Sequence, residues 1–167
     1  MRRSKALAFW PVLLGLLALD SATKDLAVER LSPAHVPHPV IGGFVRFTLT
    51  FNPDAAMGLS LGQYSRIAFG LIAVAILCGL GYYYRRVSGE SDLTAMALAL
   101  IGGGAAGNMM DRVRSSRGVI DFIDVGIGSA RFYTFNVADA GVFCGTLLLL
   151  LILMRRDRRI TVGTPPG

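Results

Sequence analysis

The sequence predicts an all-α membrane protein with four transmembrane helices and a small extracytoplasmic β-sheet. Of its 167 residues, 53% are hydrophobic and only 17% are charged, whereas about a quarter of a soluble domain is charged. The apolar residues gather in four blocks, each near the roughly 20 residues that cross a bilayer as a helix. Between the first two blocks lies a segment with strand periodicity. These features exclude a soluble enzyme, a disordered tail and a coiled coil, and they indicate one polytopic domain over residues 1–167.

Polar or charged residues bound each apolar block. The first block follows a basic N-terminus, a pattern that is also typical of a cleaved secretory signal peptide. It lacks a convincing small-x-small cleavage site and runs directly into Asp20 and Lys24, so we expect a retained span. The predicted spans are residues 6–26, 67–84, 93–110 and 134–154.

The formal net charge of +6 indicates membrane topology rather than nucleic-acid binding. Lys and Arg cluster at the N-terminus, in the 85–92 loop and in the C-terminal tail, and four spans would place these three clusters on one side. Cytoplasmic loops carry an excess of Lys and Arg. Both termini should therefore be cytoplasmic, with residues 30–65 and 113–133 outside, although the latter carries three arginines.

The 30–65 segment is more than a linker. Residues 45–51 alternate apolar and polar side chains, which is the period of a half-buried strand. Prolines precede this stretch and Gly42–Gly43 marks a turn. We expect a small sheet that rests on the outer membrane surface and could shape a platform for a substrate.

Polar groups inside membrane spans are costly and need a reason. Asp20 and Lys24 are four residues apart, so they share a helix face and can form a self-neutralising ion pair. Ser21 and Lys24 alternatively suggest a serine–lysine protease, although no second feature supports it. The first span therefore leaves both interpretations open.

The third block ends in a dense polar cluster. Gly103 and Gly107 form a G-x-x-x-G surface that allows another backbone to approach closely. Asn108, Asp111 and Arg112 follow within about one turn of helix. Asn108 lies deepest and requires hydrogen-bond partners, because an unpaired buried amide is unfavourable.

Further carboxylates precede and begin the fourth span. Asp121 and Asp124 alternate with bulky apolar residues, which indicates a strand or an interfacial segment. Asn136 and Asp139 are three residues apart and share a helix face. Asp139 would lie in the first turns of that helix, where the helix dipole favours a negative charge.

These carboxylates and amides should converge near the outer ends of the third and fourth spans. Two carboxylates at a semi-buried site can share one proton, so that one serves as base and the other as acid. The chain contains no Cys/His set for zinc, no G-x-S-x-G and no phosphate-binding loop, and we expect neither a metal nor a cofactor. An intramembrane aspartic hydrolase is one interpretation, and a proton-coupled transporter is its rival.

Five motifs occur together in the order and spacing of one known family. They are DSATK (20–24), NPDAAMG (52–58), GAAGNMMDR (104–112), VIDF (119–122) and FNVAD (135–139). In these motifs the chain resembles lipoprotein signal peptidase, also called signal peptidase II, over essentially its whole length. The last three motifs in combination are highly specific.

The resemblance implies an inner-membrane aspartic peptidase with its active site facing the outer side. Such an enzyme cleaves diacylglyceryl-modified bacterial prolipoproteins on the amino side of the lipidated cysteine, without a cofactor. Membrane lipids and globomycin-type inhibitors are the other implied partners, and nucleic acid is not. The implied catalytic pair is Asp121 and Asp139. The implied substrate-binding or dyad-supporting residues are Asp20, Lys24, Asn52, Asn108, Asp111, Arg112 and Asn136.

Two positions depart from the pattern of this family. Ser21 stands where the family usually has glutamine, and Pro53–Asp54 replaces the usual x-Gly of the N-x-G-A-A motif. The loss of that glycine should alter the loop over the site, and the additional carboxylate could change local proton affinity. Neither departure touches the implied catalytic pair.

Overall fold

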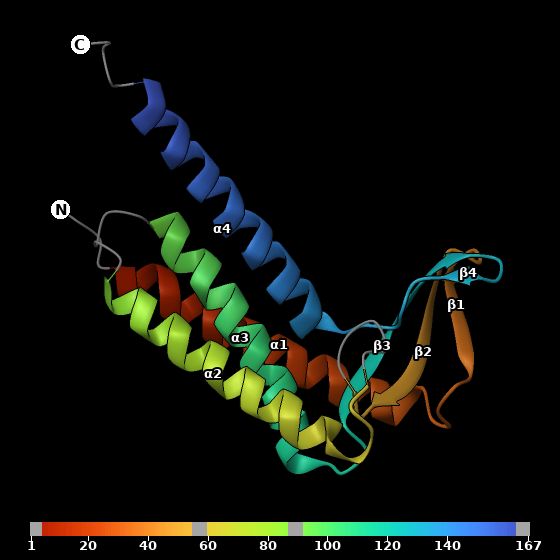
Figure 1. The fold of residues 1–167 in the computed structure, drawn as a ribbon. Coiled ribbons are helices and arrows are strands. Elements are labelled where there is room, and N and C mark those ends of the chain that lie inside the picture. The colour runs from red at the N-terminus through yellow and green to blue at the C-terminus, as the bar shows by residue number, and fades with distance from the viewer. Residues whose placement is uncertain (1–4, 55–59, 87–91, 163–167) are drawn as a thin grey trace.

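The computed structural model describes residues 5–54, 60–86 and 92–162, with side chains of the last helix described up to residue 155. Within these residues, four helices are long and apolar enough to cross a membrane. They are α1 (Lys5–Arg30), α2 (Ser65–Arg86), α3 (Asp92–Arg114) and α4 (Val137–Val162), and a short 3-10 helix, η2 (Gly62–Tyr64), leads into α2. The predicted fold class of four apolar helices and a small sheet is confirmed (Figure 1).

Helix α3 lies at the centre of the helical bundle and packs against α1, α2 and α4. Half of its apolar window is buried, against 17% or less for each of the other three helices. Glycines make this packing close: a side chain at Gly103 would approach the Leu13 carbonyl oxygen of α1 to 3.2 Å, and one at Gly104 would meet Ala138 of α4. The predicted role of the G-x-x-x-G pair as a packing surface agrees with these contacts.

The sheet has four antiparallel strands in the order β1 (Pro37–Ile41), β2 (Val45–Asn52), β3 (Val119–Ile127) and β4 (Ala130–Arg131). Residues 30–65 supply β1 and β2, and residues 113–133 supply β3 and β4. The predicted strands at 45–51 and around Asp121 are therefore confirmed, and the sheet joins them. A shift in register between Phe47 and Thr50 places an extra β2 residue opposite β3, which bends the strand as a β-bulge does.

A compact apolar cluster connects the sheet to the helices. Ala27 and Leu31 at the C-terminal end of α1 pack against Leu49 of β2 and Phe122 of β3, and all four are buried. Phe122 directly follows Asp121, so this packing holds the strand that carries Asp121 against the bundle. In Figure 1 the sheet extends sideways from the ends of the helices at which α1 stops and α4 begins, and the β1–β4 end points away from the bundle.

Helix α4 begins at Val137, three residues after the start of the predicted fourth span at residue 134. Phe135 is held in a β-bridge with Ile123, with backbone hydrogen bonds of 2.8 and 3.0 Å, and cannot be helical at the same time. Helices α1 and α3 instead run past the predicted ends at 26 and 110. The extension of α3 carries Asp111 and Arg112 out to the level of the sheet.

Candidate active site

The start of α4 is a reciprocal cap made by two of the predicted site residues. The backbone N–H of Asp139 donates to Asn136 Oδ1 at 2.9 Å, and the backbone N–H of Asn136 donates to Asp139 Oδ2 at 3.2 Å. This is a capping box, with Asn136 as N-cap and Asp139 at the third helical position. The Asn-x-x-Asp spacing thus places Asp139 in the first turn of α4 with one oxygen fixed.

Asp121 comes from the centre of β3 and is only 3% exposed. Its Oδ1 accepts a hydrogen bond of 2.7 Å from Asn136 Nδ2, and its Oδ2 accepts one of 3.3 Å from Asn52 Nδ2. The pKa of Asp121 is raised to about 7, mainly by burial and next by the negative charge of Asp139. The hydrogen bonds from Asn52 and Asn136 and the charge of Lys24 act in the opposite direction. This carboxyl group therefore holds its proton up to near-neutral pH.

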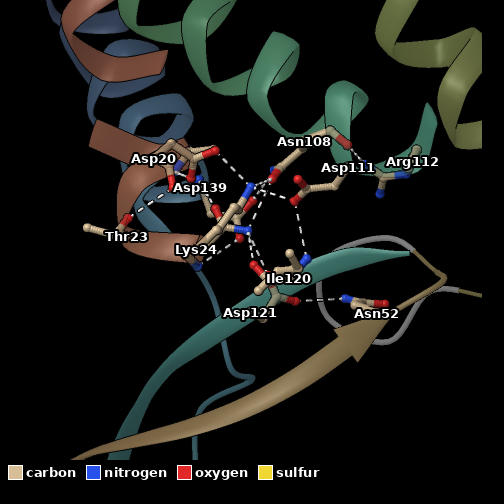
Figure 2. Close-up of polar contacts among 12 residues, drawn as sticks. Asp20, Thr23, Lys24, Asn52, Asn108, Asp111, Arg112, Ile120, Asp121 and Asp139 are labelled. Carbon is tan, nitrogen blue, oxygen red and sulfur yellow. Dashed lines mark hydrogen bonds and ion pairs between the residues drawn. The ribbon is translucent and has the colours of Figure 1, made fainter. Parts of the chain in front are cut away.

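Two asparagine side chains link Asp121 to Asp139 (Figure 2). Asn136 Nδ2 donates both to Asp121 and, at 3.1 Å, to Asn108 Oδ1. Asn108 Nδ2 in turn donates to Asp139 Oδ1 at 2.7 Å. The expectation that Asn108 needs several partners is confirmed, and these partners include the carboxylate implied as catalytic.

Lys24 lies beside this chain of amides and is only 2% exposed. Its ammonium contacts Asp20 Oδ2 and Asp111 Oδ2, each at 2.8 Å, and Asn108 Oδ1 at 2.9 Å. The predicted Asp20–Lys24 pair is confirmed, but Asp20 does more than neutralise Lys24. Its Oδ1 accepts the backbone N–H of Ala138 at 2.9 Å, and this bond joins α1 to the start of α4. Lys24 is engaged by Asp20 and Asp111, whereas a catalytic base must contact the nucleophile that it activates, which disfavours the serine–lysine alternative.

Asp111 and Arg112 connect the end of α3 to the segments around it. Asp111 Oδ2 accepts the backbone N–H of Ile120 at 3.2 Å, so Asp111 binds β3 as well as Lys24. Arg112 donates to the backbone oxygens of Asn108 at 3.2 Å and Asp54 at 3.0 Å. Its Nε is buried and has no hydrogen-bond partner among the described residues.

The backbone at residue 54 orders Asn52, which contacts Asp121. The backbone N–H of Asp54 donates to Asn52 Oδ1 at 3.0 Å, which turns the Asn52 amide nitrogen toward Asp121. The Asp54 carboxylate accepts a hydrogen bond of 2.8 Å from Ser60 Oγ. Hydrogen bonds from Ser65 and Ser60 lower the pKa of Asp54, so this additional carboxylate is a weak proton acceptor.

Asp124 does not join the site and instead anchors the sheet. Its carboxylate forms ion pairs with Arg46 Nη2 at 2.7 Å and Arg131 Nε at 2.8 Å. It also accepts a hydrogen bond of 3.1 Å from Thr48 Oγ1. The net pKa of Asp124 is lowered. Partial burial alone would raise the pKa, but the hydrogen bonds from Arg131, Arg46 and Thr48 together have a larger effect in the opposite direction. Asp124 and Arg46 are direct cross-strand partners, a relationship that becomes visible only when the strand register is known.

A groove of about 590 Å³ lies between α2 and α3 next to Arg112. Ile67, Leu71 and Val74 line it from α2, at the spacing of a single helix face. Apolar walls with an arginine at one end suit a ligand that has a long apolar part.

The structure gathers most of the predicted site residues into one network, with Arg112 at its edge. The residues in the network are Asp20, Lys24, Asn52, Asn108, Asp111, Asp121, Asn136 and Asp139. The backbone N–H groups of Ile120 and Ala138 also take part, which no sequence pattern could identify. Among the described residues, no group of three His, Cys, Asp or Glu side chains is arranged to hold a metal ion.

The fold and this site together define a multi-pass membrane protein with a cluster of buried carboxylates where its helices meet the sheet. The chain belongs to the signal peptidase II family: residues 12–155 match the family model described as Signal peptidase (SPase) II. Membership of this family makes the chain a peptidase. The four apolar helices of the chain make it a multi-pass bacterial membrane protein.

Relatives and solved structures agree with this assignment. The chain is 39% identical to a lipoprotein signal peptidase of Geobacter sulfurreducens over 152 residues, which cover 90% of this chain and 94% of the relative. It is 32% identical to the lipoprotein signal peptidase of Bacillus pumilus, over 89% of this chain and 94% of the relative.

Two solved structures of a bacterial membrane enzyme, obtained by the in meso method, share the fold. One has a TM-score of 0.82 and 25% identity, and covers 100% of this chain and 98% of its own. The other has a TM-score of 0.76 and 28% identity, and covers 92% and 97%.

Proposed function

We propose that this protein is an aspartic endopeptidase that removes signal peptides from diacylglyceryl-modified bacterial prolipoproteins, cleaving on the amino side of the lipidated cysteine. The relatives named above are lipoprotein signal peptidases. The observation that carries the aspartic mechanism is the link between Asp121 and Asp139 through the side chains of Asn136 and Asn108. Two carboxylates held in one hydrogen-bond network can divide the roles of acid and base.

The environments of the two carboxylates support different roles for them. Asp121 is the acid, because its raised pKa of about 7 keeps a proton available. Asp139 is the base. It accepts hydrogen bonds on both oxygens from Asn108 and Asn136, and it lies in the first turn of α4, where the helix dipole favours a negative charge.

The reaction then runs in two steps. Asp139 takes a proton from water as the water oxygen bonds to the scissile carbonyl carbon, and Asp121 gives its proton to the carbonyl oxygen. The tetrahedral intermediate collapses as Asp121 recovers a proton from a hydroxyl group and the carbon–nitrogen bond breaks. Asp139 passes its proton to the leaving amine, which restores both groups to their starting states.

Arg112 and the neighbouring groove suit a lipid-modified substrate. The unpartnered Nε–H of Arg112 is a donor for a substrate carbonyl, because a buried donor gains most from a partner. We assign the diacylglyceryl chains to the apolar groove between α2 and α3, which Arg112 also lines. Globomycin-type inhibitors would occupy the same region.

The experiment that tests this function is a gel-shift assay of the purified chain with a lipidated prolipoprotein. We expect cleavage of the lipidated precursor and none of the same precursor without its diacylglyceryl group. A globomycin-type inhibitor should stop the reaction. A proton-coupled carrier, the rival interpretation, would leave the precursor intact and move a solute into sealed vesicles.

The proposed substrate also requires a defined orientation in the inner membrane, with both termini cytoplasmic and the carboxylates near the outer surface. Cysteine labelling at Gln63 and Ser129 should report the outer compartment. Labelling at Gly89, which lies outside the described residues, should report the inner one. An outer signal at Gly89 would contradict the orientation.

A further inference from the structure

The polar groups of Asp54 contact three different parts of the protein. Its backbone N–H donates to Asn52 Oδ1 at 3.0 Å, and its carbonyl oxygen accepts Arg112 Nη2 at 3.0 Å. Its carboxylate instead accepts hydrogen bonds from Ser60, at 2.8 Å, and from Ser65. The backbone of Asp54 therefore meets two residues of the proposed site, whereas its side chain is anchored outside that site.

The anchor of the Asp54 side chain is the start of α2. Ser65 is the first residue of α2 and is only 2% exposed. Its Oγ accepts the backbone N–H of Leu61 at 2.7 Å, and Ser60 Oγ accepts that of Gly62 at 3.1 Å. The chain that leads into the helix thus holds both serines, and their bonds to the carboxylate attach residue 54 to the helix.

These contacts close a ring around Arg112. Arg66 directly follows Ser65, and its Nε donates to the backbone oxygen of Arg112 at 2.7 Å. The start of α2 is therefore attached to the Arg112 backbone through Arg66 and to the Arg112 guanidinium through Asp54. Arg112 Nη1 donates to the Asn108 oxygen at 3.2 Å. With Nη1 and Nη2 both held by backbone oxygens, the buried Nε is left without a partner among the described residues.

A carboxylate is well suited to anchor residue 54. Hydrogen bonds to an ionised acceptor are roughly twice as strong as those between neutral groups. The bonds from Ser65 and Ser60 lower the pKa of Asp54, so the acceptor is ionised at neutral pH. The glycine that the family usually has at this position would offer the same backbone groups without a side chain to hold them. The anchor is thus an addition made by this chain.

We propose that Asp54 is a positioning residue that holds Arg112 and Asn52 in the directions that the peptidase reaction requires. This inference rests on the proposed function, in which Arg112 binds a substrate carbonyl and Asn52 binds Asp121. Without its carboxylate, residue 54 would be held only by the two groups that it positions. Both groups would then gain freedom, and their donors would spend less time in place.

The direction of a shift in the Asp121 titration separates positioning from a simple charge effect. The Asn52 bond lowers the pKa of Asp121, so release of Asn52 in Asp54→Ala should raise that pKa. Loss of the negative charge of Asp54 alone would act in the opposite direction, because a nearby negative charge favours the protonated acid. The other charged side chains that act on Asp121 are kept in every variant, and they are Asp139, Lys24 and Arg112.

Infrared pH titration of the Asp121 carboxyl band in lipid nanodiscs tests the inference without requiring activity. The band is identified by its loss in Asp121→Asn. We expect Asp54→Ala to raise the midpoint. Asp54→Asn removes the charge but keeps an acceptor oxygen for the serines, so it should raise the midpoint less. Asn52→Ala should also raise the midpoint, and adding Asp54→Ala to it should have little further effect, because both changes act through the same bond.

Cleavage kinetics of the lipidated precursor supply the second measurement. Asp54→Ala should raise KM about tenfold, the equivalent of one hydrogen bond to the substrate, and should change kcat less. An unchanged KM, or a midpoint that is unchanged or lowered, would overturn the inference. If the unaltered chain does not cleave the precursor, the proposed function fails and the infrared titration alone decides the role of Asp54. If Asp54→Ala does not fold, Ser60→Ala, which removes the bond from the exposed serine, decides the outcome.

Discussion

Lys24 fixes the direction in which the Asn108 side-chain amide points. The Lys24 ammonium donates to Asn108 Oδ1 at 2.9 Å, so the amide nitrogen must face the other way, where it donates to Asp139 at 2.7 Å. The buried Lys24 ammonium thereby orients a donor toward the proposed base. The proposed catalytic pair of Asp121 and Asp139 therefore depends on the Lys24–Asn108 hydrogen bond as well as on its own two carboxylates.

Exchange of the charges of Asp20 and Lys24 should fail to restore the protein. A simple ion pair would tolerate the double exchange, but Asp20 also accepts the N–H of Ala138, which a lysine at position 20 cannot do. Neutralisation of Lys24 leaves the buried Asp20 carboxylate without its cation, at a cost of about 3–5 kcal/mol. Neutralisation of Asp20 leaves Lys24 paired with Asp111 and should cost less. Membrane protein level and activity per folded molecule should both be measured. A double variant with near-normal values of both would show that the pair is only electrostatic.

Asp121→Asn and Asp139→Asn should each remove nearly all turnover and leave a folded membrane protein. An amide cannot take a proton from water or return one, and the two carboxylates act as a unit. The double variant should therefore be hardly worse than either single variant. Single-turnover cleavage of the lipidated precursor measures the effect.

Asp111→Asn is the matched control for the dyad variants. Asp111 binds Lys24 and the Ile120 N–H and takes no proton in the proposed reaction. Its replacement should lower the amount or stability of the protein and retain measurable cleavage per folded molecule. A well-folded but inactive Asp111→Asn together with an active Asp121→Asn would move the dyad to Asp111 and Asp139.

Cleavage should decline as the pH rises through about 7, because Asp121 acts in its protonated form and its pKa lies near that value. The Asn52 hydrogen bond lowers this pKa. Asn52→Ala removes the bond, so the pKa should rise and the alkaline limb should move to higher pH. The apparent pKa taken from this alkaline limb belongs to the interacting pair Asp121 and Asp139 rather than to one residue. A pH profile of kcat/KM tests this, and a shift to lower pH would contradict the role given to Asn52.

Gly107→Ala should disrupt the site, whereas Gly102→Ala should be tolerated. A Cβ atom at Gly107 would lie 2.6 Å from Asp20 Oδ2, the oxygen that pairs with Lys24. At Gly102 the nearest atoms are side-chain carbons of Leu13 and Leu80 at 3.7 and 3.9 Å, and alanine gains about 1 kcal/mol of helix propensity. Thermal unfolding in detergent compares the two. Equal stability of both variants would count against close packing of α3 on Asp20.

The sequence predicted the fold class well because the bilayer imposes long apolar blocks that can be counted without knowledge of their neighbours. It also predicted strands around Phe47 and Asp121, since side-chain alternation is a local property. The start of α4 was placed too early because the pairing of Phe135 with Ile123 depends on tertiary structure. Local pattern alone could not detect it.

The candidate site was predictable in composition but not in its connections. Local motifs supplied residues such as Asp121, Asn136 and Asp139. The bond from Ala138 to Asp20 joins residues from the two ends of the chain, and the partners of Asp124 follow from strand register. Such contacts depend on how α1, α4 and the sheet meet, which single-sequence patterns do not contain.

The pairing of Asp20 with Lys24 inside one helix also bears on how the protein is made. Of the four described spans α1 is synthesised before the other three, and its two buried charges already compensate each other before those three enter the bilayer. The remaining partners arrive later, Asn108 and Asp111 with α3 and the Ala138 N–H with α4. Assembly of the catalytic centre is thus the last event of membrane insertion. A chain stopped after Arg114 should retain α1 in the membrane but bind no inhibitor.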